Sequence, residues 1–314
     1  MKELNNLTVT VFGGTGFVGR HLVRHLCIED CRVQIPTRNV SKSYFLQPLG
    51  DVGQIIPIKC DFSKNNELQQ IIKNSDVIIN LIGILYEKKK RDFENVHYGI
   101  VKKIVDIYRF SKNKKLIHLS AIGAEKNTES LYAQSKYKAE QYILKNSNNS
   151  FVVKPSIIFG PEDNFFNLFA KISFFSPFLP LIMGGKTKFQ PVYVDDVCKG
   201  IIKILTKGKS KDRIFEFGGP DIYSFKELMQ ILLQTINRKR FLLYIPKTIA
   251  FMLSKFLELF PSPILTTDQL KLLSKDNIVS KRHSTFKDLN VNPVSLELVI
   301  SDYLKRFIKD KYSF

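Results

Sequence analysis

A strand-like run that enters a glycine motif opens this chain. Residues 9–19 read Val-Thr-Val-Phe-Gly-Gly-Thr-Gly-Phe-Val-Gly, and Val18, Leu22, Val23 and Leu26 continue behind them at helical spacing. Such a motif begins a nucleotide-binding βαβ unit: its glycines allow a tight turn, admit a pyrophosphate to the backbone and let the helix pack on the strand. The pyrophosphate would lie at the positive end of the helix dipole. We therefore expect dinucleotide binding, the alternative being a purely structural glycine turn.

The first half of the chain alternates between apolar runs and amphipathic stretches. The strand-like runs are 8–13, 32–37, 55–59, 76–82, 115–120 and 150–154, and the helical stretches are 17–28, 64–74, 94–111 and 131–145. Strands that are apolar throughout are typical of a parallel sheet covered on both faces. The pattern predicts an α/β fold, with a Rossmann-type doubly wound parallel sheet over residues 1–160.

The pattern changes beyond Pro155. Phenylalanine, leucine and proline cluster between residues 165 and 183, and a strand-like run returns at 215–217. The sequence contains no internal repeat and no low-complexity linker. We expect residues 161–314 to form a smaller, mostly helical substrate lobe that interleaves with the core around 190–220.

The second predicted strand ends in Arg38 and Asn39, where NAD-preferring folds place a carboxylate on the ribose 2′-hydroxyl. The planar fork of Arg38 suits a 2′-phosphate, which predicts a preference for NADP(H) over NAD(H). The alternative is an exposed loop arginine. Asp61 and Phe62 follow the third strand, where an acidic side chain often caps the adenine, and residues 81–83 end the fourth, where a small residue leaves room for the ribose.

Tyr132 and Lys136 form a Y-x-x-x-K pair shortly after the fifth strand. Their i, i+4 spacing places both side chains on one face of a helix. A tyrosine phenol has a pKa near 10, and a nearby ammonium favours the phenolate and lowers that pKa. Such a tyrosine could protonate a carbonyl oxygen while a nicotinamide delivers hydride. The alternative is a surface tyrosine beside an extended lysine.

Composition sets the broad class. Hydrophobic residues make up 44% and charged residues 25%, as in ordinary globular proteins, while the net charge is +19. The excess lysine is dispersed along the chain, with one compact run of basic residues at 88–91. Because the sequence contains no basic motif interleaved with aromatic residues, we expect no nucleic-acid partner. A solvated surface and a contact with an anionic membrane or acidic partner remain the two interpretations.

Other candidate features are weaker. The four cysteines are scattered without a C-x-x-C pair, which favours a reducing, cytosolic compartment. We expect no targeting segment before the first strand and no membrane-spanning stretch. His21 and His25 have zinc-compatible spacing but no evident third ligand; alternating with Arg20 and Arg24, they resemble a solvated helix face, so no metal is expected.

Five further blocks, taken with these motifs, give the sequence a family resemblance. They are Asn80–Glu87, Phe93–His97, Lys154–Asp163, Phe189–Val197 and Leu265–Leu270. In these blocks and motifs the chain resembles the extended short-chain dehydrogenase/reductase superfamily. It is most similar to the atypical, NAD-dependent epimerase/dehydratase-like branch that contains the NAD(P)H-binding accessory subunit of respiratory complex I and bacterial single-chain members.

The resemblance implies a cofactor pocket and a set of site residues. The expected cofactor contacts are Gly13, Thr15, Gly16, Phe17, Val18, Gly19, Arg38, Asp61, Phe62, Leu81, Ile82, Gly83, Tyr132, Lys136, Pro155 and Ile158. Tyr132, Lys136 and Ser120 are the catalytic candidates. Either Ser120 or Ala121 aligns with the family's serine, and His97 stands where catalytic members have a proton-relay asparagine. A missing serine donor would cost about a few kcal/mol of transition-state stabilisation.

Two functions remain open at this stage. The first is an NADP(H)-dependent oxidoreductase whose hydrophobic, quinone-related substrate would enter an apolar lobe lined by residues 165–183 and 241–265. The second is a non-catalytic protein associated with complex I or its assembly, in which NADPH is structural. The candidate partners are respiratory complex I, quinone-biosynthesis proteins and an anionic membrane surface.

A stripe of apolar residues bears on the membrane question. Leu253, Phe256, Leu257 and Phe260 follow i, i+3, i+4, i+7 spacing beside Lys255, which is compatible with a helix lying on a membrane or with core packing. The expected location is the bacterial cytoplasm, peripheral on the inner face of the cytoplasmic membrane.

Overall fold

The computed structural model describes residues 4–109, 114–207, 212–261 and 263–308. Its centre is a seven-stranded sheet in the order β11-β6-β5-β4-β1-β2-β3, and every adjacent pair is parallel. The strands are β1 (Thr8–Phe12), β2 (Arg32–Thr37), β3 (Ile55–Lys59), β4 (Val77–Asn80), β5 (Lys115–Leu119), β6 (Ser150–Pro155) and β11 (Ile214–Phe217). The order reverses between β1 and β4, which is where a doubly wound sheet binds its ligand.

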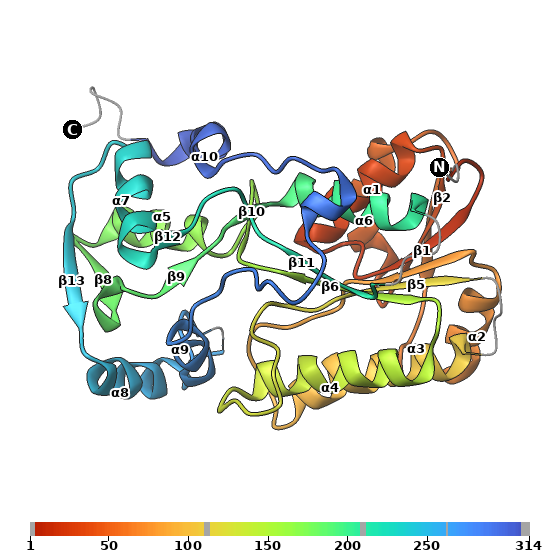
Figure 1. Cartoon of the computed structure of the whole chain (residues 1–314), viewed down its shortest axis with the longest axis horizontal. Coiled ribbons are helices and arrows are strands. Elements are labelled where there is room, and N and C mark those ends of the chain that lie inside the picture. The colour runs from red at the N-terminus through yellow and green to blue at the C-terminus, as the bar shows by residue number, and fades with distance from the viewer. Residues whose placement is uncertain (1–3, 110–113, 208–211, 262, 309–314) are drawn as a thin grey trace.

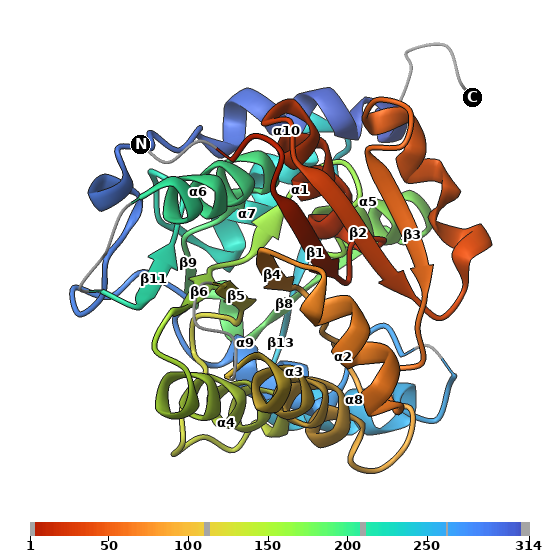
Figure 2. The same cartoon turned by 90° about the vertical axis from the view of Figure 1, so that its right-hand side faces the viewer.

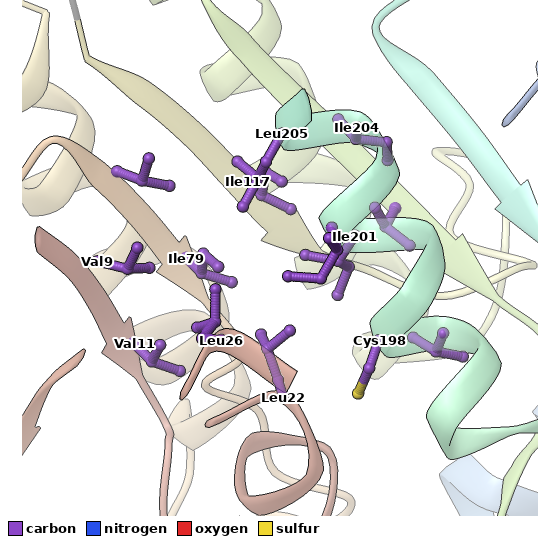
Figure 3. Close-up of a cluster of buried hydrophobic side chains, with 14 of the residues drawn as sticks. Val9, Val11, Leu22, Leu26, Ile79, Ile117, Cys198, Ile201, Ile204 and Leu205 are labelled. Carbon is purple, nitrogen blue, oxygen red and sulfur yellow. The ribbon is translucent and has the colours of Figure 1, made fainter. Parts of the chain in front are cut away.

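Helices cover both faces of this sheet, as Figure 2 shows. One face carries α1 (Phe17–Ile28) and α6 (Val194–Thr206), and the other carries α2 (Asn65–Lys73), α3 (Ile100–Tyr108) and α4 (Leu131–Asn146). Figure 3 shows the first of these layers, in which Leu22 and Leu26 of α1 and Ile201 of α6 meet the apolar side chains of the strands. The predicted α/β doubly wound fold is confirmed.

Of the remaining elements, the 3-10 helices Val40–Leu49 and Phe286–Leu289 pack with the main core, whereas most others form a lobe at one end of the molecule (Figure 1). Its helices are α5 (Phe166–Phe175), α7 (Phe225–Thr235), α8 (Lys247–Leu257), α9 (Thr267–Leu273) and α10 (Leu296–Leu304). Its strands are β7 (Ile158–Phe159), β8 (Phe178–Ile182), β9 (Lys188–Phe189), β10 (Val192–Tyr193), β12 (Tyr223–Ser224) and β13 (Phe241–Ile245). Short pairs join β7 to β10, β9 to β12 and β8 to β13. Residues 165–170 pack in the core of this lobe.

Two expectations about local structure need correction. The predicted helix over 94–111 is divided into a π-helical turn, Glu94–Gly99, and α3, while residues 110 and 111 lie outside the described residues. Within the lobe expected to be mostly helical, the apolar segments 178–182 and 241–245 form a parallel strand pair, and both contain phenylalanine and isoleucine, which favour strands. That pair lies at the far end of the lobe from β1–β3.

Candidate nucleotide and active site

The turn between β1 and α1 forms a backbone cradle. Gly13 has φ +83°, and a Cβ at this position would lie 3.0 Å from the carbonyl carbon of Leu81. A Cβ at Gly19 would lie 2.3 Å from the Gly13 carbonyl oxygen, so α1 packs directly on the turn. Gly16 is the N-cap of α1, no side chain caps it, and the first turn holds no acidic residue. No side chain therefore competes with an anion at this helix N-terminus, and the residues fit the pyrophosphate of a dinucleotide.

The other predicted residues of this turn connect it to the second lobe. Thr15 and Val18 lie partly exposed within the turn and the first helical residues. The ring of Phe17 lies against Gly160, where an added Cβ would approach it to 3.3 Å. Pro155 is buried at the end of β6, and Ile158 packs against the main core from β7. The segment after β6 thus passes close to the start of α1, as the site requires.

The ends of β2 and β3 carry the residues expected at the adenosine end. Arg38 is exposed directly after β2. Asp61 accepts hydrogen bonds from the backbone N–H and the hydroxyl of Ser63, and these bonds hold the pKa of the Asp61 carboxyl below its usual range. Phe62 packs edge-on against Phe12 of β1. These side chains lie at the carboxyl ends of adjacent parallel strands, on the edge that binds ligands in such sheets.

The end of β4 meets the helix that carries the tyrosine and lysine. Leu81 donates its backbone N–H to Phe12 O, and Ile82 donates to the Asn80 side chain. A Cβ at Gly83 would lie 3.3 Å from Nζ of Lys136, so this glycine lies directly beside the end of the lysine side chain. The glycine turn, the end of β4 and α4 therefore surround one site.

Tyr132 and Lys136 lie one turn apart on α4, as predicted, but their electrostatics differ from the expectation. Nζ of Lys136 donates to the Leu119 carbonyl oxygen at 3.1 Å, and burial lowers its pKa to about 8. Burial and the charge of Asp268 raise the pKa of Tyr132 to about 12. The expected lowering of the Tyr132 pKa by Lys136 is therefore wrong for this state, because the lysine is directed at a backbone oxygen and is itself desolvated.

Asp268, from α9 of the second lobe, caps the N-terminus of α4. Its carboxylate accepts from the Ser130 hydroxyl at 2.7 Å and from the backbone N–H groups of Leu131 and Tyr132 at 2.7 and 3.2 Å. Ser130 in turn accepts from the Ala133 N–H, as an N-cap residue does. A carboxylate at a helix N-terminus also complements the helix dipole. Sequence reasoning did not identify Asp268; its only signal was the block 265–270 quoted for the family resemblance.

His97 lies beside Tyr132 and is buried. The two rings meet edge to face with centroids 5.2 Å apart. Nε2 of His97 accepts the Ile84 N–H at 3.0 Å, and Nδ1 lies 2.8 Å from the hydroxyl of Ser135, which donates to Tyr132 O. These partners require a neutral imidazole protonated at Nδ1, and burial lowers its pKa to about 2. The π-helical turn Glu94–Gly99 places this ring, and such turns are common at functional sites.

Ser120, the third catalytic candidate, is engaged elsewhere. Its buried hydroxyl donates to the carboxylate of Glu140, which lies one turn beyond Lys136 on α4. Lys154 of β6 donates to the same carboxylate at 3.3 Å. Burial raises the pKa of Glu140, while Lys154 and Ser120 oppose that shift. The hydroxyl of Ser120 is thus bonded to Glu140, with no bond to Tyr132.

The histidines of α1 are not the solvated face expected from sequence. His21 lies 3.0 Å from both Asp195 and Glu162, and His25 lies 3.4 Å from Asp195. Both acids come from distant segments, which is why the sequence gave no indication of them. Among the described residues, no group of three or more His, Cys, Asp or Glu side chains is arranged to hold a metal ion. Within the same residues, no helix is long and apolar enough to cross a bilayer.

Known sequences resemble this chain over most of its length. A sequence model described as the NAD dependent epimerase/dehydratase family matches residues 9–218. The chain is 32% identical to subunit 9 of the NADH dehydrogenase [ubiquinone] 1 alpha subcomplex of Arabidopsis thaliana, covering 98% of this chain and 80% of that protein. It is 31% identical to the Mus musculus subunit of the same name, covering 97% and 81%.

Comparison with solved structures supports the fold. A UDP-glucose 4-epimerase from Thermotoga maritima superposes with a TM-score of 0.70 at 16% identity, over 96% of this chain and 99% of that one. At that identity the likeness concerns the fold alone. The Rossmann-like arrangement of sheet and flanking helices is common to both chains.

Proposed function

The chain belongs to the NAD dependent epimerase/dehydratase family, and from that premise we propose that it is an NADP(H)-binding oxidoreductase acting on a hydrophobic, quinone-related substrate. Membership of this family implies that it binds a nicotinamide cofactor. The observation that carries the proposal is that the uncapped glycine turn packs against Leu81 at the end of β4, while Gly83, two residues further on, lies beside Lys136.

Different residues at the site would bind different parts of the cofactor. The cradle of Gly13, Gly16 and Gly19 would take the pyrophosphate, and the exposed guanidinium of Arg38 would take a 2′-phosphate. Lys136 would bind the nicotinamide ribose. When bound, the nicotinamide supplies or accepts the hydride.

Tyr132 would exchange the proton. With a pKa of about 12, its phenol is protonated at neutral pH and is a proton donor towards a carbonyl oxygen. Acting as a base instead would require a lower pKa, which a charged Lys136 turned towards the phenol would provide. Ser120 would stabilise the developing oxyanion only after leaving Glu140.

A second candidate function is supported by the same details. The engagement of Ser120 by Glu140, the neutral His97 and the high pKa of Tyr132 all suit a protein that retains NADPH without turning it over. The Arabidopsis and mouse relatives are named as subunits of NADH dehydrogenase [ubiquinone]. This alternative makes the protein a complex I-associated or assembly factor, with the cofactor as part of its fold.

The partner and location proposals follow from the relatives and the charge. We propose respiratory complex I and quinone-biosynthesis proteins as partners, and attachment to the inner face of the cytoplasmic membrane. The net charge of +19 favours an anionic surface.

Native mass spectrometry of the purified protein, with release and identification of bound nucleotide, tests the proposal first. Exchangeable NADPH that is oxidised by quinones or carbonyls supports the oxidoreductase, whereas stoichiometric NADPH resistant to both supports the structural role. Tyr132→Phe should then abolish turnover and leave cofactor binding intact. Tyr142→Phe, on the same helix and bonded to Asp106, is the control and should retain activity. Absence of any nicotinamide binding overturns both candidates.

A further inference from the structure

Helix α8 presents four of its large apolar side chains to the outside of the protein, while Phe251 and Leu257 are half-buried. Ala250 and Ser254 are its buried residues. Met252 is 74% exposed and Phe256 is 59% exposed, and Ile249, Leu253 and Phe260 are also exposed at helical spacing with them. The sequence left both membrane contact and core packing open for the stripe of Leu253, Phe256, Leu257 and Phe260. Of these side chains, only Leu257 is half-buried and the other three are exposed.

The exposed apolar surface continues onto the neighbouring strand pair. Phe241 of β13 and Phe178 of β8 are exposed and meet at a centroid distance of 6.0 Å. Phe175, at the end of α5, is 85% exposed. Of the 22 exposed large hydrophobic side chains in the described part of the chain, 13 lie in segments 164–186 and 236–264. We call this surface the α8–β13 face; Figure 1 shows its elements together at the end of the molecule opposite β1–β3.

The charge around this face is almost entirely positive. Segments 164–186 and 236–264 contain seven basic residues and one acidic residue, Glu258. Glu258 accepts hydrogen bonds from the N–H and hydroxyl of Thr267, so it is committed to capping α9. Arg238 lies 4.6 Å from the ring of Phe174, and Lys239, Lys247 and Lys255 are exposed. Basic side chains thus border an apolar surface.

We propose that the α8–β13 face docks on the surface of an anionic lipid bilayer, a proposal that rests on the membrane attachment suggested above. An apolar helix face bordered by lysine and arginine is the arrangement that inserts between lipid headgroups while the cations contact anionic lipids. A second copy of the chain fits less well, because the same face on both partners would bring two basic borders together. With 11 residues, α8 is an interfacial helix, too short to cross the bilayer.

Sedimentation with phosphatidylcholine vesicles, with and without phosphatidylserine, tests the proposal. The protein should bind the phosphatidylserine vesicles at low salt at least tenfold more strongly than the neutral ones. The double variant Met252→Ser/Phe256→Ser should lose most of this binding, and so should the double variant Lys239→Glu/Lys255→Glu. Val52→Ser, which removes an exposed apolar side chain shortly before β3, is the matched control and should bind as the unmodified protein does.

Three outcomes overturn the proposal: no binding to phosphatidylserine vesicles at low salt, equal binding to both vesicle types, or a dimer in light scattering that the Met252→Ser/Phe256→Ser variant disrupts. Bound NADPH is measured in the same samples. If the protein retains NADPH but does not bind vesicles, only the docking proposal is contradicted. If it binds vesicles but holds no nucleotide, only the proposed cofactor function is contradicted.

Discussion

Helices α1 and α8 carry large apolar side chains at the same spacing, yet one set is buried and the other is exposed. Leu22, Val23 and Leu26 of α1 are each 0% exposed. Their positional counterparts in α8, at residues 252, 253 and 256, are 74%, 42% and 59% exposed. The first set packs between the sheet and α6, as Figure 3 shows, whereas α8 buries only two small residues. An apolar stripe therefore predicts that one face of the helix packs against an apolar surface. It does not show whether that surface belongs to the same chain.

The helices at the two ends of the molecule are accordingly packed differently. At the α1 end, the buried stripe packs on the sheet and Gly19 lies directly against the glycine turn, as the proposed anion site would require. Helix α8 contributes only two small residues to the core, and its exposed large apolar side chains form part of the α8–β13 face. Helix α9 connects α8 to the helix layer on the other face of the sheet, since Glu258 at the end of α8 caps α9 and Asp268 of α9 caps α4.

Truncating matched positions of α1 and α8 measures how differently the two helices are packed. Leu22→Ala should lower the free energy of unfolding by about 2–5 kcal/mol, because it leaves a cavity between α1 and the sheet. Met252→Ala should change it by no more than about 0.5 kcal/mol, because that side chain is mostly solvated. Urea denaturation of both variants measures the difference. Equal losses would mean that α8 is packed in solution and would contradict the distinction.

A second test concerns the close packing of α1 on the glycine turn. A Cβ at Gly19 meets only backbone atoms, at 2.3–2.7 Å, so Gly19→Ala should cost about 1–3 kcal/mol and weaken NADPH binding. The matched change Gly99→Ala adds a methyl in a helical conformation with its nearest neighbour at 3.7 Å. It should be neutral or stabilise by up to about 1 kcal/mol. Melting temperatures with and without NADPH distinguish the two variants. If Gly19→Ala changed neither stability nor NADPH binding, the proposed role of the glycine turn in holding the pyrophosphate would be refuted.

The pH dependence of stability tests the pocket around His97. The unfolded chain binds a proton at this histidine below about pH 6.5, whereas the folded state does so only near pH 2. Stability is therefore lost as the pH falls from about 6.5, by up to about 1.4 kcal/mol per pH unit for this group. His97→Gln should flatten this slope. An unchanged slope in His97→Gln would show that His97 is solvated.

The link between the lobes is tested at Asp268. Asp268→Ala removes three hydrogen bonds at the N-terminus of α4 and should cost about 1–2 kcal/mol. It should also speed the release of NADPH, since α4 positions Lys136. Asp276→Ala, which removes a single exposed bond to the Lys188 N–H, is the control. Stopped-flow fluorescence measures the rate of NADPH release from both variants. Equal release rates in the two variants would exclude a role for α9 in cofactor retention.

The smallest expected effect is a change of cofactor preference without a change of fold. Arg38→Asp should shift the ratio of NADPH to NADH affinity by about tenfold towards NADH, because a carboxylate repels a 2′-phosphate and accepts a bond from a 2′-hydroxyl. Titration of both cofactors by fluorescence measures this ratio. Unchanged relative affinities would remove Arg38 from the proposed site.

Local pattern was sufficient for much of the fold. The glycine motif, the strand at 32–37 and the helix at 17–28 follow from spacing alone, and the Tyr132/Lys136 pair follows from the i, i+4 rule. These features depend on residues within a few positions of one another, and backbone geometry fixes their relation wherever the chain folds.

Tertiary structure decided the partners of those residues. Asp268 reaches α4 across 137 positions, and His21 meets Asp195 across 174. Only the packed molecule directs Lys136 to the Leu119 carbonyl, pairs Ser120 with Glu140 and leaves Met252 uncovered. Periodicity specifies which face of an element is apolar, whereas the contacts of that face, and the pKa values that depend on them, are set by segments whose approach no local pattern encodes.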